Sequence, residues 1–257
     1  MGEFCRVEKE GRLTIVTIER PDVMNALHPP GNFELAEAFD DFAADPEQWV
    51  AIITGAGDRA FSAGNDLKYQ ASGGKMGGPK SGFAGLTARF DNSKPVIAAV
   101  NGLAMGGGFE IALACDLIIA SENAIFALPE PRVGLAALAG GIHRLPREIG
   151  MKQAMGMLLT GRRVPAAEGQ QLGFVNEVVP KGQALTAATQ WAAQILGCAP
   201  IAVRASKEAA MQGLAAESLE AAIKGRYDQI AALYASEDFI EGPRAFSEKR
   251  PPNWKGK

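Results

Sequence analysis

The chain has 257 residues, of which 47% are hydrophobic and 21% are charged, and its formal net charge is −3. This composition predicts a folded globular protein with one large domain, or a core domain with an appendage. The slight acidity removes the electrostatic reason to expect nucleic acid or an anionic membrane as a main partner. No uncharged apolar run is long enough to span a membrane, because Asp116 interrupts the most hydrophobic stretch.

The sequence lacks the patterns of a metal site, a disulfide framework or an export signal. Residues 1–20 mix charges with alternating apolar residues and contain no apolar signal-peptide core. The cysteines and histidines show no paired spacing. They are Cys5, Cys115, Cys198, His28 and His143. We therefore expect a cytoplasmic protein with no bound metal.

The N-terminal part predicts a hairpin, a helix and a buried strand. Residues 4–20 alternate between apolar and polar in the manner of two short strands. Apolar residues then recur at helical spacing from Leu35 to Phe42, and the pattern stops at Asp45. The apolar run at 50–54 predicts the next strand, buried on both faces.

Further strands are expected at 95–100 and 116–120, with a helix between them that ends near Cys115. Apolar strands that alternate with short helices favour parallel pairing and right-handed crossovers, so the predicted fold class is α/β. The glycine-rich stretch at 71–86 is expected to form a mobile loop.

The character of the chain changes after a predicted strand at 174–179, and nearly everything beyond it is expected to be helical. A mainly helical region should begin near residue 198. Five apolar residues in it are spaced to form one helix face. They are Leu219, Ile223, Tyr227, Ile230 and Tyr234.

A possible dinucleotide-binding turn follows the strand at 50–54. Gly55, Gly57 and Ala60 match the pattern GxGxxA directly after a strand. The residues that follow do not form a continuous helix pattern, and no acidic residue stands about 20 positions further on. A simple glycine-rich turn is the favoured interpretation.

Three consecutive glycines, residues 106–108, stand just before Glu110 at the start of an apolar run. Unpaired amides at a helix start carry partial positive charge and can be approached closely where there is no Cβ, which suits an oxyanion. Glu110 would then face the same pocket as the Gly107 amide. The alternative is that the glycines permit close helix packing and Glu110 only caps the helix.

Four segments together resemble the crotonase family, also called the enoyl-CoA hydratase/isomerase family, over essentially the whole chain. They are FSAGNDLK (61–68), KPVIAAVNGLAMGGGFEIALACDLIIAS (94–121), FALPE (126–130) and EGPRAFSEKR (241–250). FSAGNDLK and the C-terminal IEGPRAFSEKRPPNWKG look most similar to the carnitinyl-CoA dehydratase (crotonobetainyl-CoA hydratase) branch.

The resemblance implies an architecture. The crotonase (ClpP-like) fold is a spiral of ββα units with a helical C-terminus that packs into trimers, often doubled to hexamers. For this chain it implies a core at residues 1–197 and a helical trimerisation region at 198–257. The expected partners are an acyl-CoA substrate and further copies of the chain, as a homotrimer or a dimer of trimers.

The resemblance also implies a reaction. By motif position, the backbone N–H groups of Asn65 and Gly107 would hold the thioester oxygen, and Glu110 and Glu130 would share acid and base catalysis. The presence of two glutamates favours reversible hydration of a 2-enoyl-CoA. Double-bond isomerisation is less favoured, because one catalytic glutamate often suffices for that reaction. The expected activity is that of an enoyl-CoA hydratase without a cofactor, because CoA is part of the substrate. An isomerase and a non-catalytic acyl-CoA binding protein remain alternatives.

Further positions match the family's contacts with CoA. Some of these residues would come from the C-terminus of a neighbouring subunit. If either of the two lysines among them does not contact CoA, it is a solvated surface charge. The matching positions are Ala63, Asp66, Leu67 and Lys68, together with Phe246 and Lys249 from the neighbour.

The sequence departs from the family at several places. Ala137 and Leu138 replace a Pro-Gly pair that many relatives carry, and this leucine is expected to narrow the pocket or shift the attacked carbon. Asp22 stands where some relatives carry a basic CoA contact. A trimethylammonium substrate would require an aromatic cage or a carboxylate. The rings available for a cage are Tyr69, Phe83 and Phe90.

Overall fold

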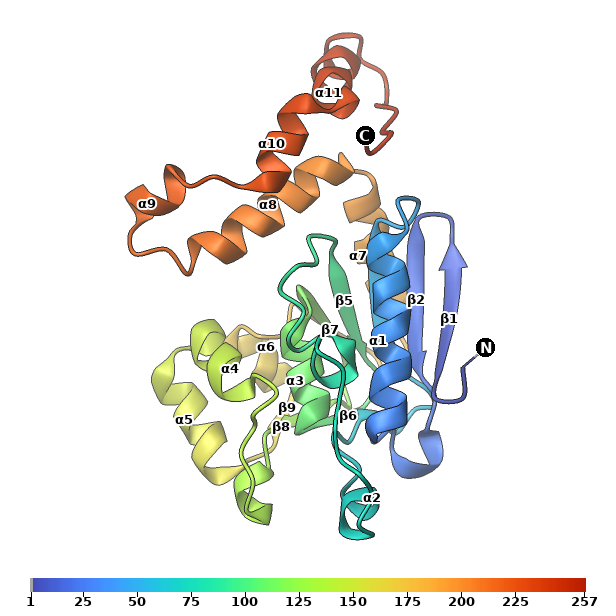
Figure 1. Cartoon of the computed structure of the whole chain (residues 1–257), viewed down its shortest axis with the longest axis vertical. Helices are drawn as coiled ribbons and strands as arrows, with labels where there is room; N and C mark the ends of the chain where they lie inside the picture. Colours follow the sequence, from blue (N-terminus) through green and yellow to red (C-terminus); the bar gives the residue numbers. More distant parts are fainter. Residues whose placement is uncertain (1) are drawn as a thin grey trace.

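A twisted six-stranded sheet forms the centre of the molecule (Figure 1). The computed structural model describes residues 2–257. All neighbouring strands of this sheet are parallel except the first two, which form the predicted hairpin. In spatial order they are β1 (Cys5–Glu10), β2 (Leu13–Ile18), β3 (Val50–Gly55), β5 (Val96–Val100), β7 (Leu117–Ser121) and β10 (Glu177–Val179).

A second sheet of four short strands lies beside the first. β3, β5 and β7 of the main sheet are each followed along the chain by one strand of this smaller sheet. The chain therefore repeats a unit of two strands, one in each sheet, as in the predicted spiral. The strands of the second sheet are β4 (Ala60–Ser62), β6 (Leu103–Met105), β8 (Ile125–Ala127) and β9 (Val164–Pro165).

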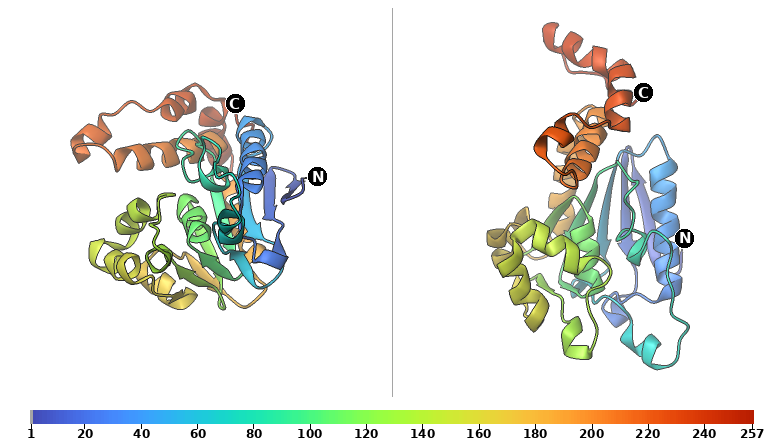
Figure 2. Two further views of the ribbon diagram at one scale, coloured as in Figure 1. Left: turned by 60° about the horizontal axis from the view of Figure 1, so that its bottom comes forward. Right: turned by 60° about the vertical axis from the view of Figure 1, so that its left-hand side comes forward.

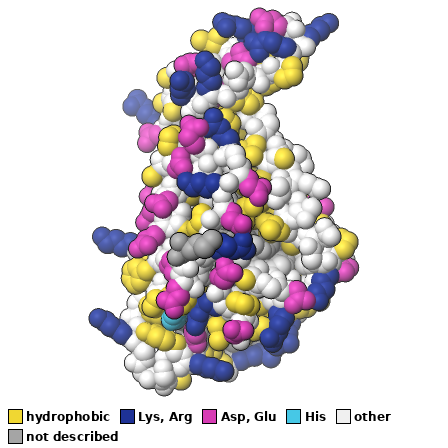
Figure 3. All heavy atoms as spheres, turned by 90° about the vertical axis from the view of Figure 1, so that its right-hand side faces the viewer, with side chains coloured by type: hydrophobic (Ala, Val, Ile, Leu, Met, Phe, Trp, Pro, Cys, Tyr) yellow, Lys and Arg dark blue, Asp and Glu magenta, His cyan; other side chains and the backbone are white. Residues whose placement is uncertain are grey.

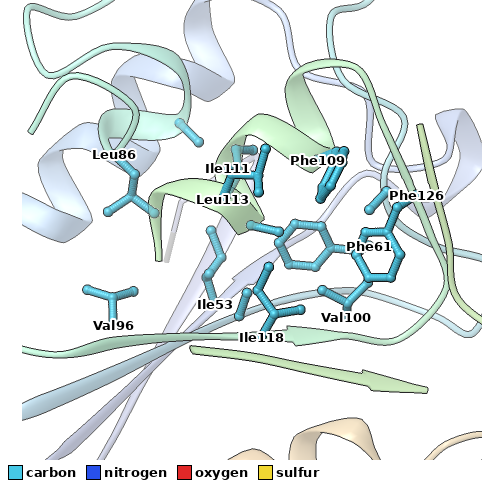
Figure 4. Packing of buried hydrophobic residues seen from close by; sticks show 14 of the residues in the cluster. Ile53, Phe61, Leu86, Val96, Val100, Phe109, Ile111, Leu113, Ile118 and Phe126 are labelled. Atoms are coloured by element: carbon cyan, nitrogen blue, oxygen red, sulfur yellow. The ribbon is translucent and has the colours of Figure 1, made fainter. Parts of the chain in front are cut away.

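Apolar side chains alternate between the two faces of the main sheet and create two cores. Ile53 belongs to the core that includes α3 (Gly107–Ala114), and Ile52 belongs to the core covered by α7 (Ala184–Leu196). Figure 4 shows side chains of α3 lying over those of the sheet. Because both faces are covered, the central strands are continuously apolar, which is why they could be recognised from sequence.

The remaining helices of the core pack around these sheets. α1 (Pro29–Ala44) buries Leu35, Phe39 and Phe42 as predicted. The others are η1 (Pro21–Val23), α2 (Leu67–Ala71), η2 (Phe83–Gly85), η3 (Glu130–Val133), α4 (Gly141–Ile149), α5 (Met151–Thr160) and α6 (Ala166–Leu172). Residues 84–86 are buried, with Gly85 against Ala36 of α1, so this end of the glycine-rich stretch is packed rather than a free loop.

The last four helices form an arm that projects from the core (Figures 1 and 2). They are α8 (Pro200–Gly213), α9 (Leu219–Ile223), α10 (Asp228–Ala235) and α11 (Glu237–Ser247). α8 packs against α9 and α10, and α11 packs against α10. Large apolar side chains of the arm are exposed, among them Leu214, Leu219, Ile223, Tyr234 and Phe246.

The structure corrects two expectations and excludes one alternative that the sequence disfavoured. The face expected from Leu219 to Tyr234 is divided between α9 and α10, because the chain leaves the helix at residues 224–227, around Gly225. The final strand of the main sheet covers only Glu177–Val179 of the predicted 174–179. The GxGxxA turn leads into strand β4 and not into a helix, so the dinucleotide-binding interpretation is wrong.

Acidic and basic side chains are interspersed on the face of the molecule seen in Figure 3, so neither sign of charge dominates this face. Among residues 2–257, no helix is both long and apolar enough to cross a membrane.

Candidate active site

The glycine triplet forms the turn between β6 and α3. Gly106 has φ 53°, and its N–H donates to the carbonyl oxygen of Ala127 at 2.9 Å. Gly108 lies against β4, where an added Cβ would collide with the carbonyl of Ser62. Positive φ at Gly106 and close contact at Gly108 therefore require glycine. The triplet does permit close packing, as one interpretation of the sequence held, and all three of its residues are buried.

The backbone N–H groups of Asn65 and Gly107 lie close together. Gly64 (φ 83°) brings the two segments into contact, since a Cβ there would be 2.7 Å from the nitrogen of Gly107. The strand-like bridge to Leu27 uses the carbonyl of Gly64 and the N–H of Asp66, at 2.7 and 2.9 Å, and bypasses the N–H of Asn65. No acceptor within residues 2–257 bonds either N–H. The pair is thus available to an external oxygen atom.

A buried polar network holds the Asn65 segment in place. The Ser62 hydroxyl donates to the carbonyl of Asn25 at 2.8 Å and accepts from the N–H of Gly64 at 3.1 Å. The Asn25 side chain donates to the carbonyl of Ala60 at 2.8 Å. Sequence reasoning missed these supporting residues. The available signal was Asn25 itself, a polar residue directly before the apolar Ala26 and Leu27.

Glu110 projects from the first turn of α3 and is only 3% exposed. Its Oε1 accepts the N–H of Gly141, at the start of α4, at 2.9 Å. Burial raises the pKa of Glu110 to about 7, and the negative charge of Glu130 adds to this effect. The N–H groups of Gly141 and Ala139 act in the opposite direction. A carboxyl group in this state can gain or release a proton near neutral pH.

Glu130 is the first residue of η3 and lies beside the glycine triplet. Its Oε1 is 2.8 Å from the position that a Cβ on Gly106 would occupy. Its Oε2 is buried, and no group within residues 2–257 donates a hydrogen bond to it. Burial raises the pKa of Glu130 as well. The structure therefore brings Glu130 to the glycine turn that also leads to Glu110 and the Gly107 amide.

The residues expected to contact CoA along the FSAGNDLK segment differ in their availability. Ala63 is half-buried, and Leu67 and Lys68 are exposed on α2. The Asp66 carboxylate is already engaged, because it pairs with Arg20 at 3.1 Å and accepts the N–H of Tyr69 at 3.1 Å. Asp66 thus shapes the segment through these bonds.

Phe246 and Lys249 lie in or just beyond α11 and are exposed, Phe246 by 87%. Figures 1 and 2 show α11 at the end of the molecule opposite α2. Within one chain these two residues are therefore not brought together with Asn65, Glu110 and the other predicted site residues.

The departures from the family pattern also have a structural outcome. Ala137 is buried beside Gly141, whereas Leu138 is 77% exposed and does not pack into the space around Glu110. The expected narrowing by Leu138 is thus not seen in the single chain.

The three aromatic rings do not form a cage. Tyr69 packs edge-on against His28, with ring centroids 5.4 Å apart. Phe83 covers Gly107, and Phe90 is 84% exposed. Among residues 2–257, no group of three or more His, Cys, Asp or Glu side chains is placed to hold a metal ion.

The chain is similar in sequence and in fold to known proteins. Residues 8–257 match the family model described as enoyl-CoA hydratase/isomerase. Carnitinyl-CoA dehydratases of Salmonella typhi and Citrobacter koseri are 44% identical to the chain, with 100% of both sequences covered. The crystal structure of enoyl-CoA hydratase from Mycobacterium tuberculosis H37Rv superposes with a TM-score of 0.93 at 38% identity, covering 100% of each chain.

A probable enoyl-CoA hydratase/isomerase from Mycobacterium abscessus superposes with a TM-score of 0.92 at 40% identity, again over 100% of each chain. The predicted α/β crotonase fold and the family resemblance are confirmed. The chain belongs to the enoyl-CoA hydratase/isomerase family.

Proposed function

We propose that the chain is an enoyl-CoA hydratase, which adds water reversibly to a 2-enoyl-CoA thioester. The observation that carries this proposal is the convergence of two unbonded N–H groups, of Asn65 and Gly107, with the buried carboxyl group of Glu110 and the half-buried side chain of Glu130, whose Oε2 is buried. Each of these four groups was expected from the sequence. Their roles follow from the chemistry that such an arrangement supports.

The two N–H groups polarise the thioester. In the transition state of conjugate addition, negative charge collects on the thioester oxygen, and donors fixed in advance stabilise it there. The start of α3 contributes its partial positive charge at Gly107. Loss of one such donor costs about 3 kcal/mol in comparable sites.

The two carboxyl groups move the protons. Glu110 takes one proton from water while the water oxygen bonds to the β-carbon. Glu130 delivers its proton to the α-carbon, and dehydration is the reverse. The Gly141 N–H favours ionised Glu110, and the unpartnered Oε2 favours protonated Glu130, which supports this division. Burial of Glu110 opposes it by raising the pKa of this carboxyl group to about 7, so that part of it is protonated at neutral pH.

The acyl group is the second part of the proposal. Full-length identity of 44% to carnitinyl-CoA dehydratases supports crotonobetainyl-CoA as a substrate beside simple enoyl-CoA thioesters. The rings of Tyr69, Phe83 and Phe90 do not surround a cation in one chain, so a trimethylammonium group would rely on other contacts. An isomerase is disfavoured because the second carboxyl group, Glu130, is present beside the glycine triplet with a buried Oε2.

Assembly and location complete the proposal. The exposed apolar residues of the arm and the remoteness of Phe246 from α2 support a homotrimer, or a dimer of trimers, in which the arm of one subunit completes the CoA site of another. CoA enters as part of the substrate, and no cofactor is required by the chemistry. A cytoplasmic location and a role in fatty acid metabolism remain predictions from the sequence.

An absorbance assay of the conjugated thioester tests the reaction, with crotonyl-CoA and crotonobetainyl-CoA as substrates in ¹⁸O-labelled water. Hydration predicts loss of the conjugated band together with one labelled oxygen in the product. Formation of a conjugated band from a 3-enoyl-CoA, without label, would identify an isomerase instead. Binding of both thioesters by calorimetry without turnover would identify a non-catalytic protein.

A further inference from the structure

Arg144 occupies the first turn of α4 and has no role in the proton transfers described above. Its side chain is half-buried, and its Nη2 donates to the carbonyl oxygen of Thr87 at 2.9 Å. Its guanidinium carbon lies 5.7 Å from the centre of the Phe90 ring. Through these contacts α4 is joined to the segment that follows the glycine-rich stretch.

Thr87 links Arg144 to the oxyanion site through Phe83. Its hydroxyl accepts the N–H of Phe83 at 2.8 Å, and the residue is 5% exposed. The Phe83 ring covers Gly107, since its Cε1 lies 2.6 Å from the position of an added Cβ. The ring that covers one oxyanion donor is therefore positioned through Thr87 by Arg144.

The same guanidinium packs against the turn that holds Glu110. Gly140 has φ 109°, and an added Cβ there would collide with Nη1 of Arg144. The backbone N–H of Arg144 donates to the carbonyl of Gly140 at 2.8 Å, a helical bond that does not depend on the side chain, and the next residue, Gly141, donates to Glu110. Arg144 thus stands between the turn that fixes Glu110 and the segment that covers Gly107.

Arg144 and Glu110 also influence each other electrostatically. The ionisable groups that influence the Arg144 guanidinium are Glu148, Cys115 and Glu110. Those that influence Glu110 are Glu130 and Arg144. The positive charge of Arg144 lowers the pKa of Glu110, although burial, which raises it, is the larger effect.

We propose that Arg144 is a positioning residue that ties the Thr87–Phe83 segment over Gly107 to the Gly140–Gly141 turn holding Glu110. It thereby fixes the position of the Gly107 N–H relative to the carboxyl group of Glu110. The inference rests on the proposed function for its catalytic consequence, whereas the tie itself is a property of the free protein. Sequence reasoning missed Arg144, because a single arginine among the charges of HRLPRE gives no signal of its contacts.

Amide hydrogen exchange of the free protein tests the tie directly. In Arg144→Gln, exchange in residues 82–88 and in residues 138–142 should both accelerate about tenfold, because both segments lose one shared support. Thr87→Val should accelerate only the first segment, because it removes the hydroxyl that bonds Phe83. Arg147→Gln is the matched control, since the Arg147 guanidinium, on the same helix, donates within residues 2–257 only to the His143 carbonyl. Unchanged exchange in both segments of Arg144→Gln would overturn the proposal.

Steady-state kinetics test the consequence. Arg144→Gln should lower kcat about 100-fold with KM changed far less, the penalty of misplacing reacting groups by about 1 Å. Loss of the positive charge in Arg144→Gln should also raise the lower of the two pKa values in the pH–rate profile. Arg144→Lys, which keeps the charge, should restore that pKa but recover kcat only in part. A kcat close to that of Arg147→Gln would overturn the positioning role. If the variants show the predicted exchange pattern but wild type hydrates no thioester, the proposed function alone is refuted. If Arg144→Gln fails to fold, Thr87→Val provides the test. Normal exchange in residues 82–88 together with a normal kcat in Thr87→Val would contradict the tie.

Discussion

Oε1 of Glu110 accepts the N–H of Gly141 at 2.9 Å, so the buried carboxyl group on α3 faces the start of α4. This single bond is the main polar contact of a side chain that is only 3% exposed. It holds the carboxyl group in one orientation without fully offsetting the cost of burying its charge. The same arrangement that prepares Glu110 for proton transfer should therefore reduce the stability of the fold.

The first prediction concerns the pH dependence of stability. Burial raises the pKa of Glu110 from 4.5 to about 7, so between these pH values the folded state binds more protons than the unfolded state. The stabilising contribution is complete below pH 4.5 and is lost as pH rises through about 7, a change of about 3 kcal/mol. Glu110→Gln removes this dependence. Its free energy of unfolding relative to wild type should thus increase by a few kcal/mol from acidic to mildly alkaline pH.

Denaturant unfolding of both proteins at the same concentration, at several pH values, measures this difference. A difference between Glu110→Gln and wild type that does not vary with pH would show that Glu110 titrates normally in the folded protein.

A second prediction concerns Gly64. Alanine there would combine a positive φ of 83° with a Cβ 2.7 Å from the nitrogen of Gly107, and would push apart the two oxyanion donors. We expect Gly64→Ala to lower kcat about 100-fold or more. Gly73→Ala is the matched control, because Gly73 has φ 80° but no atom within 4 Å of an added Cβ.

Both variants should share the backbone cost of a positive φ, about 1 kcal/mol, but only Gly64→Ala should lose activity. Melting temperatures and kcat for the two proteins separate these effects. Equal kcat in both variants would argue against an oxyanion site at Asn65 and Gly107.

A third prediction concerns the pair of Arg20 and Asp66. Burial of Asp66 is outweighed by the N–H of Tyr69 and by Arg20, so its pKa lies below the ordinary value. The stability it supplies is present above the ordinary pKa of an aspartate and is lost as pH falls. Asp66→Asn should cost about 1–3 kcal/mol at neutral pH, since it leaves Arg20 without its partner in a mostly buried setting. Glu220→Gln, which removes the exposed partner of Lys224, should cost little by comparison.

Chemical denaturation at neutral and acidic pH measures both variants. If Asp66→Asn and Glu220→Gln are equally stable at neutral pH, the Arg20 pair is not an important anchor of the FSAGNDLK segment.

A fourth prediction concerns the arm. Size-exclusion chromatography with light scattering should find particles of three or six chains of 27.0 kDa. Phe246→Asp should raise KM for the acyl-CoA or dissociate the assembly, because it places a charge in an apolar contact. Phe33→Asp, at a half-exposed phenylalanine of α1, should do neither. A monomer with full activity would contradict a site shared between subunits.

The sequence predicted the parts of the structure that depend on local patterns. Buried strands such as Val50–Gly55 and Val96–Val100 are apolar throughout, and the apolar spacing of α1 ends at Asp45 as expected. The identity of the four site groups came from motif resemblance. Their proximity depends on Gly64 approaching Gly107 and on Glu130 approaching Gly106, contacts between distant segments that no local pattern encodes.

Two further features were not predicted from the sequence. Apolar spacing continues through Gly225, so only the structure shows that α9 and α10 are separate helices. Arg144 acts through carbonyl and ring contacts with Thr87 and Phe90, which depend on how α4 packs against residues 82–90.

The most direct test of the proposed mechanism is the rate of crotonyl-CoA and crotonobetainyl-CoA hydration by wild type, Glu110→Gln and Glu130→Gln. The mechanism predicts hydration by wild type and a loss of about 10²–10⁴-fold in kcat for each variant, with acyl-CoA binding by calorimetry largely retained. Near-normal rates in both variants would contradict it.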